Sequence, residues 1–308
     1  VYGALLGCLV VHPILLQILI PKFGLSGSAM AIVLTQIVQV SVVLLYMWWK
    51  EPVCYKPETW NGLSLYAIRQ ALQIKPTVRF LELSLGGILS LSEWWFWEVV
   101  CILAGHMGVI PLCVHTIAYN LVPICFTVPL GLTIGLSIRM GHVLADDVHK
   151  AKVLAATCMG IVVVLACSLA LVLWHFQDLI VALFTTDEEV KKGCKEIWHF
   201  VCIYMVLMYI FGINGGILRA LGKQWTMALI ICAVLWLGAL PTLVHFAVYK
   251  GGGVQQIWHI LPMFYFVMNV LLILSYATAD WHAISASVRE RRASQAMEMA
   301  ESSYLLEG

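Results

Sequence analysis

The sequence predicts an all-α fold, a polytopic membrane bundle of about eight transmembrane helices. Of its 308 residues, 61% are hydrophobic and only 11% are charged. An ordinary soluble domain has about 25% charged residues. The apolar residues also gather into runs of about 20, the length of helix that crosses the hydrocarbon core of a bilayer. These observations exclude a soluble fold.

Eight segments have the length and hydropathy of membrane-spanning helices. They lie at 1–21, 25–49, 78–105, 112–138, 152–174, 197–218, 225–249 and 256–280. The turn Pro21–Gly24 separates the first two, and the small residues of Gly24–Ala31 favour close helix packing. The chain starts at Val1 inside an apolar run with no charged segment before it, so we interpret it as a fragment rather than as a signal peptide.

The hydropathy falls between residues 50 and 77, where apolar residues recur at the spacing of an amphipathic helix on a membrane surface. We expect this linker to separate the helices of 1–49 from a six-helix unit at 78–281, which a polar, mobile tail at 282–308 follows. Most Lys and Arg residues fall in loops on the linker's side, which predicts a cytoplasmic linker and C-terminus. The acidic loop from His175 to Glu196 then faces the opposite side.

The stretch Ser92–Glu98 places two glutamates and three tryptophans within membrane depth. A charge there costs about 2.5–3.5 kcal/mol on insertion scales, so a glutamate is retained mainly where it faces protein or water. Glu93 and Glu98 are separated by about 140° around a helix and should have different roles. Trp94 and Trp95 precede Glu98 by one turn, and a carboxylate beside indole rings can bind a proton or a cation. Alternatively, the tryptophans form an interfacial belt and the glutamates bond to neighbouring helices.

The fourth predicted span contains His115, Tyr119 and Asn120 on nearby turns. Pro123 and Pro129 follow, and prolines that bend a helix are typical of transporters that line a cavity and change shape. We therefore place all three polar side chains in a substrate cavity and treat the two prolines as hinge residues. His115 could exchange protons with Glu98, or could bond to a hydroxyl or carbonyl group. Asn120 could line the cavity or bond to another helix.

Asn214 in the sixth span is a further cavity candidate, although its glycine neighbours favour close packing and a supporting role. The chain has no Walker loop, no zinc-binding HExxH and no CxxC pair, and its ten cysteines fall mostly in apolar runs. Its net charge of +1 gives no basic surface for nucleic acid. We expect no metal, no cofactor and no enzymatic activity, with the lipid bilayer and a small organic substrate as partners.

Several stretches resemble the motifs of one transporter family, in order along nearly the whole chain. Glu93–Glu98, with Leu103–Gly105, resembles a Glu-Trp-Trp-x-x-Glu pattern. The others are Gly24–Ala31 (Gly-x-x-Gly-x-Ala), Val128–Gly131 (Val-Pro-x-Gly), Ser137–Gly141 (Ser-x-Arg-Val-Gly), Phe184–Asp187 (Phe-Thr-x-Asp) and Gly215–Gln224 (Gly-x-x-Arg-Gly-x-Gly-x-Gln). By these motifs the chain resembles the multidrug and toxic compound extrusion (MATE) transporters, especially the eukaryotic branch.

The resemblance implies twelve helices in two six-helix lobes, of which this chain holds the last two helices of the N-terminal lobe and all of the C-terminal lobe. The missing helices would lie upstream. It implies export of an organic cation or metabolite by alternating access, in exchange for protons or sodium, with Glu98 as the first coupling candidate and Glu93 beside it. The protein would lie in the plasma membrane or, since Glu301–Leu306 resembles an acidic dileucine signal, in a vacuolar or endosomal membrane.

Three positions depart from the family pattern. Met208 stands where eukaryotic members have another acid, Asn120 where animal members often have Glu, and Ala145–Asp147 where Gly-Ala-Gly is usual. Fewer membrane acids would reduce the preference of the cavity for cations. One alternative is a lipid or oligosaccharide flippase of the wider superfamily, which should place basic residues in its cavity. Another is a truncated fragment that transports nothing.

Overall fold

The computed structural model describes residues 7–54, 72–290 and 293–294, and every regular element in these ranges is helical. The chain divides into two units, Val1–Val78 and Arg79–Gly308, which are described separately. The elements are η1 (Gly7–Val11), α2 (His12–Cys54), α4 (Ile74–Ser90), α5 (Ser92–His106), α6 (Val109–Asp146), α7 (Val148–His175), α8 (Gln177–Phe184), α9 (Glu188–Ala220), α10 (Gln224–Ile231), η2 (Cys232–Ala239), α11 (Leu240–Leu243), η3 (Val244–Tyr249) and α12 (Gly253–Ala277).

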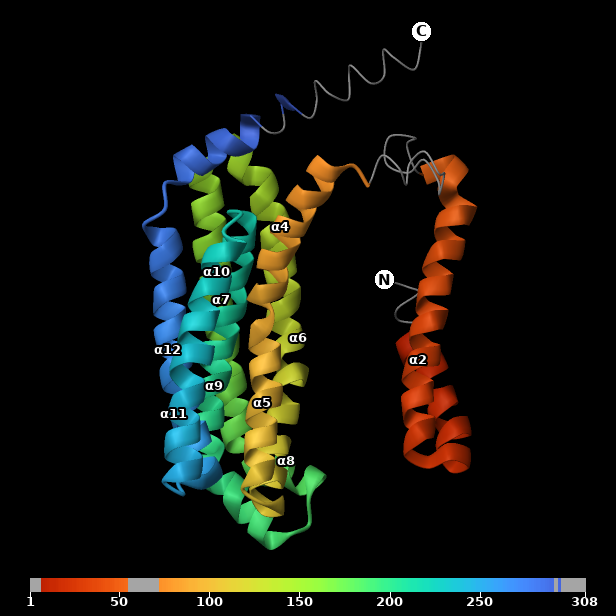
Figure 1. The fold of residues 1–308 in the computed structure, drawn as a ribbon, viewed down its shortest axis with the longest axis vertical. Helices are drawn as coiled ribbons and strands as arrows, with labels where there is room; N and C mark the ends of the chain where they lie inside the picture. Colours follow the sequence, from red (N-terminus) through yellow and green to blue (C-terminus); the bar gives the residue numbers. More distant parts are fainter. Residues whose placement is uncertain (1–6, 55–71, 291–292, 295–308) are drawn as a thin grey trace. The chain divides into compact units, whose positions relative to one another are not determined.

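The first unit contains a helical hairpin. Gly24 interrupts α2 with φ 58° and ψ −130°, and there the chain reverses direction, as the red segment of Figure 1 shows. The two arms approach closely, because a Cβ atom on Gly27 would lie 2.2 Å from the carbonyl oxygen of Leu19. Nδ1 of His12 and Oγ1 of Thr35 lie 3.0 Å apart across the hairpin. The predicted turn and close packing around Gly24 are therefore present.

Seven helical segments among the described residues are long and apolar enough to cross a membrane. The first, Leu9–Tyr46, contains both arms of the hairpin, so these seven segments account for the eight predicted spans. The predicted all-α membrane fold is confirmed. Its proposed division into the end of one lobe and a complete second lobe stays a prediction, and the predicted amphipathic helix falls mostly in residues 55–71, outside the described ranges.

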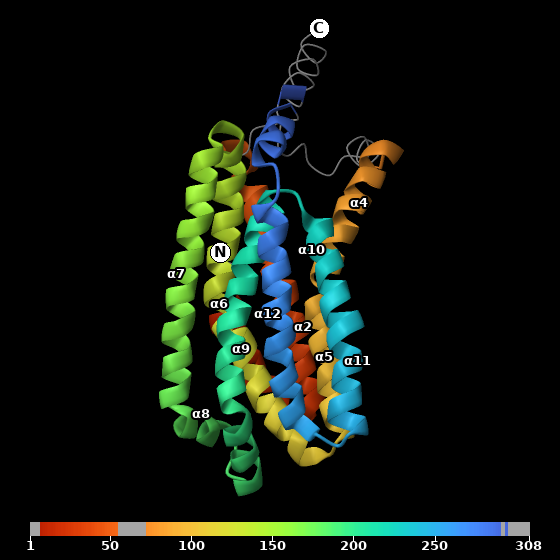
Figure 2. The same ribbon diagram turned by 90° about the vertical axis from the view of Figure 1, so that its left-hand side faces the viewer.

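The second unit is a bundle built around α9. In the most apolar part of α9, 78% of the residues are buried, whereas the corresponding figure for α7 is 17%. Figures 1 and 2 show α9 running between α6, α7 and α12, and it contacts all three. The helix α5 packs beside α6 and η2. This arrangement turns one side of α5 towards the buried centre of the bundle and leaves its other side exposed.

The third predicted span is present as Phe80–His106, with a break at Leu91 that divides it into α4 and α5. Two other predicted segments differ from the structure. The predicted loop from His175 to Glu196 contains α8 and the start of α9. The predicted mobile tail begins with a helix at 281–290. This helix packs on the bundle: Trp281 is 5% exposed, and Nε of Arg289 donates to the carbonyl oxygen of Ala145 at 2.6 Å. Short helices and tertiary contacts of this kind leave little trace in hydropathy.

Pro123 and Pro129 both lie inside α6, which continues as one helix through them. A proline cannot donate to the carbonyl four residues earlier, and for Pro129 that carbonyl belongs to Cys125. Tyr209 of α9 supplies the missing donor, with its hydroxyl 2.8 Å from the Cys125 oxygen. This bond stabilises the helix at the proline, and the role of the two prolines as hinges stays a prediction.

Candidate functional site

The break at Leu91 places Glu93 in the first turn of α5. The backbone N–H of Trp94 donates to the carbonyl oxygen of Leu91, and the side chain of Ser90 bonds back to Gly87. The start of a helix carries free N–H groups and a partial positive charge, so an acidic side chain is favoured there. The local chain geometry therefore favours a carboxylate at position 93.

Glu93 is 7% exposed and is held by two donors from different helices. The hydroxyl of Tyr265 in α12 donates to Oε1 of Glu93 at 2.5 Å, and Nε1 of Trp97 donates to the same oxygen at 3.1 Å. The Trp97 N–H is also 2.9 Å from the Tyr265 oxygen, which closes a triangle. No ion pair in the described part of the chain involves Glu93. Its charge would thus be buried without a cation, which is costly unless a proton or a ligand neutralises it.

Glu98 lies on the other side of α5, as the helical spacing predicts. It is exposed, and its Oε1 accepts a hydrogen bond of 3.1 Å from the hydroxyl of Tyr119 in α6. Glu93 and Glu98 are therefore in different environments, one within the bundle and one at its surface.

An aromatic cluster fills the space between α5, α6 and α12. The ring of Trp97 is stacked on Tyr119 at 5.6 Å and on His115 at 6.1 Å. His115 is fully buried, and neither of its ring nitrogens has a hydrogen-bond partner among the described residues. The expectation that His115 bonds to a hydroxyl or carbonyl is therefore wrong for this structure. The rings of Trp97 and Tyr119 stack on His115, and the ring of Trp258 packs against it at a tilt.

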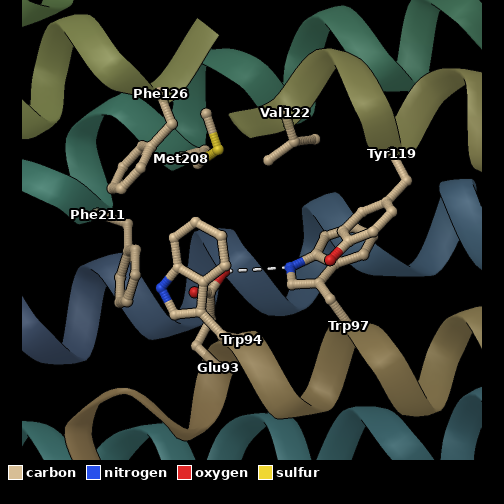
Figure 3. A pocket seen from close by; sticks show the side chains of 8 residues that line it. All are labelled: Glu93, Trp94, Trp97, Tyr119, Val122, Phe126, Met208 and Phe211. Carbon is tan, nitrogen blue, oxygen red and sulfur yellow. Dashed lines mark hydrogen bonds between the residues drawn. The ribbon is translucent and has the colours of Figure 1, made fainter. Parts of the chain in front are cut away.

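A narrow pocket lies over Glu93, with a cavity volume of about 10 Å³, room for about one water molecule. Figure 3 shows Trp94 in front of Glu93, with Phe126 and Phe211 on one side and Trp97 and Tyr119 on the other. The full lining is Glu93, Trp94, Trp97, Tyr119, Val122, Phe126, Met208 and Phe211. The pocket thus joins one carboxylate to an aromatic wall, side chains that can contact a cation, and an organic cation would need the pocket to widen.

Four predicted cavity residues lie outside this lining. Trp95 is 52% exposed and Asn120 is also exposed, while His115 lies beneath the aromatic cluster. Asn214 is fully buried: its Nδ2 donates to Oδ1 of Asn269 at 2.9 Å, and its Oδ1 accepts from the hydroxyl of Tyr276 at 3.1 Å. Asn214 therefore joins α9 to α12, in line with the supporting role that its glycine neighbours favour.

The middle of the chain, residues 87–244, matches the MatE family. This match covers slightly more than half of the sequence and includes every residue that lines the pocket. The chain belongs to the MatE family. With seven apolar helical segments in its described residues, this MatE chain is an integral membrane protein.

Two similar proteins are named as multidrug and toxin extrusion proteins. Protein 1 of Danio rerio is 28% identical over 288 residues, which cover 93% of this chain and 47% of the relative. Protein 2 of Homo sapiens is 26% identical over 283 residues, covering 91% of this chain and 46% of the relative. The MatE chain thus spans about half the length of these relatives.

Solved transporter structures share the fold. The eukaryotic MATE transporter AtDTX14 superimposes with a TM-score of 0.80 at 21% identity, over 94% of this chain and 64% of its own. A MOP superfamily transporter from Pyrococcus furiosus, described as having a binding pocket of reverse polarity that suggests a different function, gives a TM-score of 0.70 at 17% identity over 94% of this chain and 62% of its own. The similarity to the MATE fold is therefore confirmed at the level of architecture.

Sequence reasoning missed several residues of the pocket in this MatE chain. Trp97 was part of the recognised stretch but was not assigned to the site, although it lies four residues after Glu93 and so on the same helix face. Tyr265 lies in another helix far along the chain, and no local pattern connects it to Glu93. The break before Glu93 left no capping signal, because the N-cap residue of α5 is Leu91, which makes no side-chain cap bond. The other lining residues that were missed are Val122, Phe126 and Phe211.

Proposed function

We propose that this MatE chain is the C-terminal lobe, with part of the N-terminal lobe, of a secondary active transporter that exports organic cations or metabolites. Protons, or sodium ions, would move in the opposite direction by alternating access. The observation that carries the proposal is the pocket itself, a buried carboxylate without a cation partner under an aromatic wall. The names of the relatives from Danio rerio and Homo sapiens support the same function.

Glu93 is the better candidate for the coupling site. Its two donors hold the carboxylate in one position, and its burial makes an unneutralised charge costly, so a proton or a substrate cation must compensate for it. Competition between the proton and the cation for one carboxylate couples their movement. The sequence makes Glu98 the first candidate for the coupling site. In the structure Glu98 is exposed and accepts a hydrogen bond from Tyr119, which suits an entry site for the substrate.

The lining residues argue against the flippase alternative. A flippase that binds lipid or sugar phosphates needs cations in its cavity, whereas the eight lining residues include a glutamate and no lysine or arginine. Met208 stands in the wall at the position to which the family resemblance assigns an acid, so the pocket lining includes a single carboxylate. We therefore expect a preference for monovalent cations with large apolar groups over dications.

Transport of a fluorescent monovalent organic cation tests the proposal. The whole transporter that contains this chain is reconstituted in vesicles, and uptake is followed with a pH gradient, with a sodium gradient and with neither. We expect Glu93→Gln to abolish the response to the coupling gradient, because glutamine cannot take up a proton. Glu98→Gln, the matched control on the same helix, should keep the coupling and raise the KM for the cation.

Two outcomes would contradict this assignment. Full coupling in Glu93→Gln removes Glu93 from the mechanism, and loss of coupling in Glu98→Gln alone restores the order expected from the sequence. Transport that ignores both gradients in the unmodified protein argues against secondary active transport itself.

A further inference from the structure

A second pocket lies at the end of the bundle where α7 begins and where α9 and α12 end. Its cavity volume is about 340 Å³, at the lower end of the range for small-molecule sites. Figure 1 shows the helix at 281–290, in dark blue, lying across this end of the second unit. The lining is Lys152, Ala155, Ala156, Met159, Ile217, Tyr276, Ala277 and Trp281. None of these residues lines the pocket over Glu93.

One wall of this pocket is rigid and aromatic. Trp281 is 5% exposed, and its Nε1 donates to the carbonyl oxygen of Tyr276 at 2.8 Å. The hydroxyl of Tyr276 is used inwards, in its bond to Asn214 at 3.1 Å. The aromatic wall therefore presents ring surfaces to the pocket, and its polar groups are already engaged.

Lys152 is the charged side chain of the lining, and it remains available. Its ammonium group lies 5.7 Å from the centre of the Trp281 ring, and no ion pair within the described ranges engages it. Lys150, two residues before Lys152, instead forms an ion pair with Asp147 at 3.4 Å. Asp280 lies close enough to Lys152 to sense its charge, but its Oδ1 already accepts from the backbone N–H groups of His282 and Ala283.

The remaining lining is apolar and includes three alanines. Ala155, Ala156 and Ala277 leave a hollow on helices that are long and apolar enough to span the membrane, and Met159 and Ile217 extend it. A lysine beside tryptophan and tyrosine, next to an apolar groove, is typical of the boundary between headgroups and acyl chains. The nearby carboxylate of Asp280 would repel a purely anionic headgroup and attract an ammonium group.

We propose that this pocket binds a zwitterionic glycerophospholipid, with the headgroup phosphate on Lys152 and the first part of an acyl chain over the three alanines. The site is separate from the pocket over Glu93, with which it shares no lining residue. A lipid there would join the helix at 281–290 to α7, α9 and α12.

Native mass spectrometry of the protein in a neutral detergent tests the site, with dioleoylphosphatidylethanolamine as the probe. We expect Lys152→Gln to weaken retention of this lipid about tenfold, the loss of one charge-assisted hydrogen bond to phosphate. Lys150→Gln removes the same charge two residues away, outside the pocket, and should change retention less than about twofold. Ala156→Leu fills the hollow, keeps the lysine and should also reduce retention.

Several results would overturn the proposal. They are equal retention in Lys152→Gln and Lys150→Gln, equal retention of dioleoylglycerol, which has the same chains but no phosphate, and preferential retention of dioleoylphosphatidylglycerol. Competition by soluble glycerophosphoethanolamine would overturn the lipid assignment in favour of free phosphate esters. If Lys152→Gln does not fold, Ala156→Leu decides, and unchanged retention in that variant excludes the groove.

Discussion

Glu93 and Glu98 lie on one helix, yet the two sides of α5 differ in almost every physical respect. Glu93 is 7% exposed and bonds to a tyrosine of α12 and a tryptophan of its own helix. Glu98 is exposed and bonds to a tyrosine of α6. The comparison teaches that the helix period separates the two carboxylates, while the helices packed on each side determine what each carboxylate can do.

The largest contrast should come from the tryptophans on the two sides. Trp97 is 2% exposed at the centre of the aromatic cluster, whereas Trp95 is 52% exposed. Truncation of a buried aromatic residue costs about 3–5 kcal/mol through lost burial and the cavity left behind. We expect Trp97→Ala to lower the unfolding free energy by about that amount and Trp95→Ala by less than about 0.5 kcal/mol, as measured by denaturation in mixed micelles. Equal losses would show that the two sides are not energetically distinct.

A second test removes the tyrosine hydroxyl that donates to each carboxylate. Tyr265→Phe takes away the donor 2.5 Å from Glu93, and Tyr119→Phe takes away the donor 3.1 Å from Glu98. A hydrogen bond to a charged, buried group is worth about 1.5–3 kcal/mol, while water can replace a donor at an exposed group. Thermal unfolding should therefore show a clear loss for Tyr265→Phe and a loss below about 0.5 kcal/mol for Tyr119→Phe. A larger effect at Tyr119 would reverse the comparison.

Much of this contrast could be predicted from the sequence. The hydropathy runs predicted the membrane helices, and the positions of Glu93 and Glu98 on opposite sides follow from helix geometry alone. The partner of Glu93 could not be predicted, because Tyr265 and Glu93 meet only through the packing of α12 against the bundle. The burial of His115 without a polar partner could not be predicted either. A histidine in an apolar helix has the same sequence pattern whether its ring forms hydrogen bonds or stacks on other rings.

Asn214 in α9 and Asn120 in α6, both predicted to line the cavity, also differ in burial. Asn214 is fully buried and bonds to Asn269 and Tyr276, whereas Asn120 is exposed. Asn214→Ala removes the partner of the buried Asn269 amide and of the half-buried Tyr276 hydroxyl, so we expect a loss of about 1–2 kcal/mol in the unfolding free energy. Asn120→Ala should be nearly neutral in stability. If Asn214→Ala changes the substrate range in the vesicle assay while stability is unchanged, Asn214 belongs to the cavity after all.

The smallest expected effect concerns a carboxylate that needs no burial to be held. Asp147 caps α7, and the pKa of its carboxyl lies below the ordinary 3.8 because the backbone N–H of Lys150 donates to Oδ1 at 3.0 Å. A lowered pKa in the folded state stabilises the protein above the unfolded-state pKa, and this contribution is lost as the pH falls through the folded-state pKa. Asparagine keeps the cap but does not titrate.

Asp147→Asn should therefore be slightly less stable than the parent near pH 6, and the difference in melting temperature should vanish on acidification below 3.8. The comparison requires both proteins in the same detergent at each pH. A difference that persists unchanged at low pH would mean that the cap acts through its geometry and not through its charge. In that case, hydrogen bonds to the backbone would hold Asp147 independently of its protonation, and the charge of a carboxylate would affect stability only at buried positions such as Glu93.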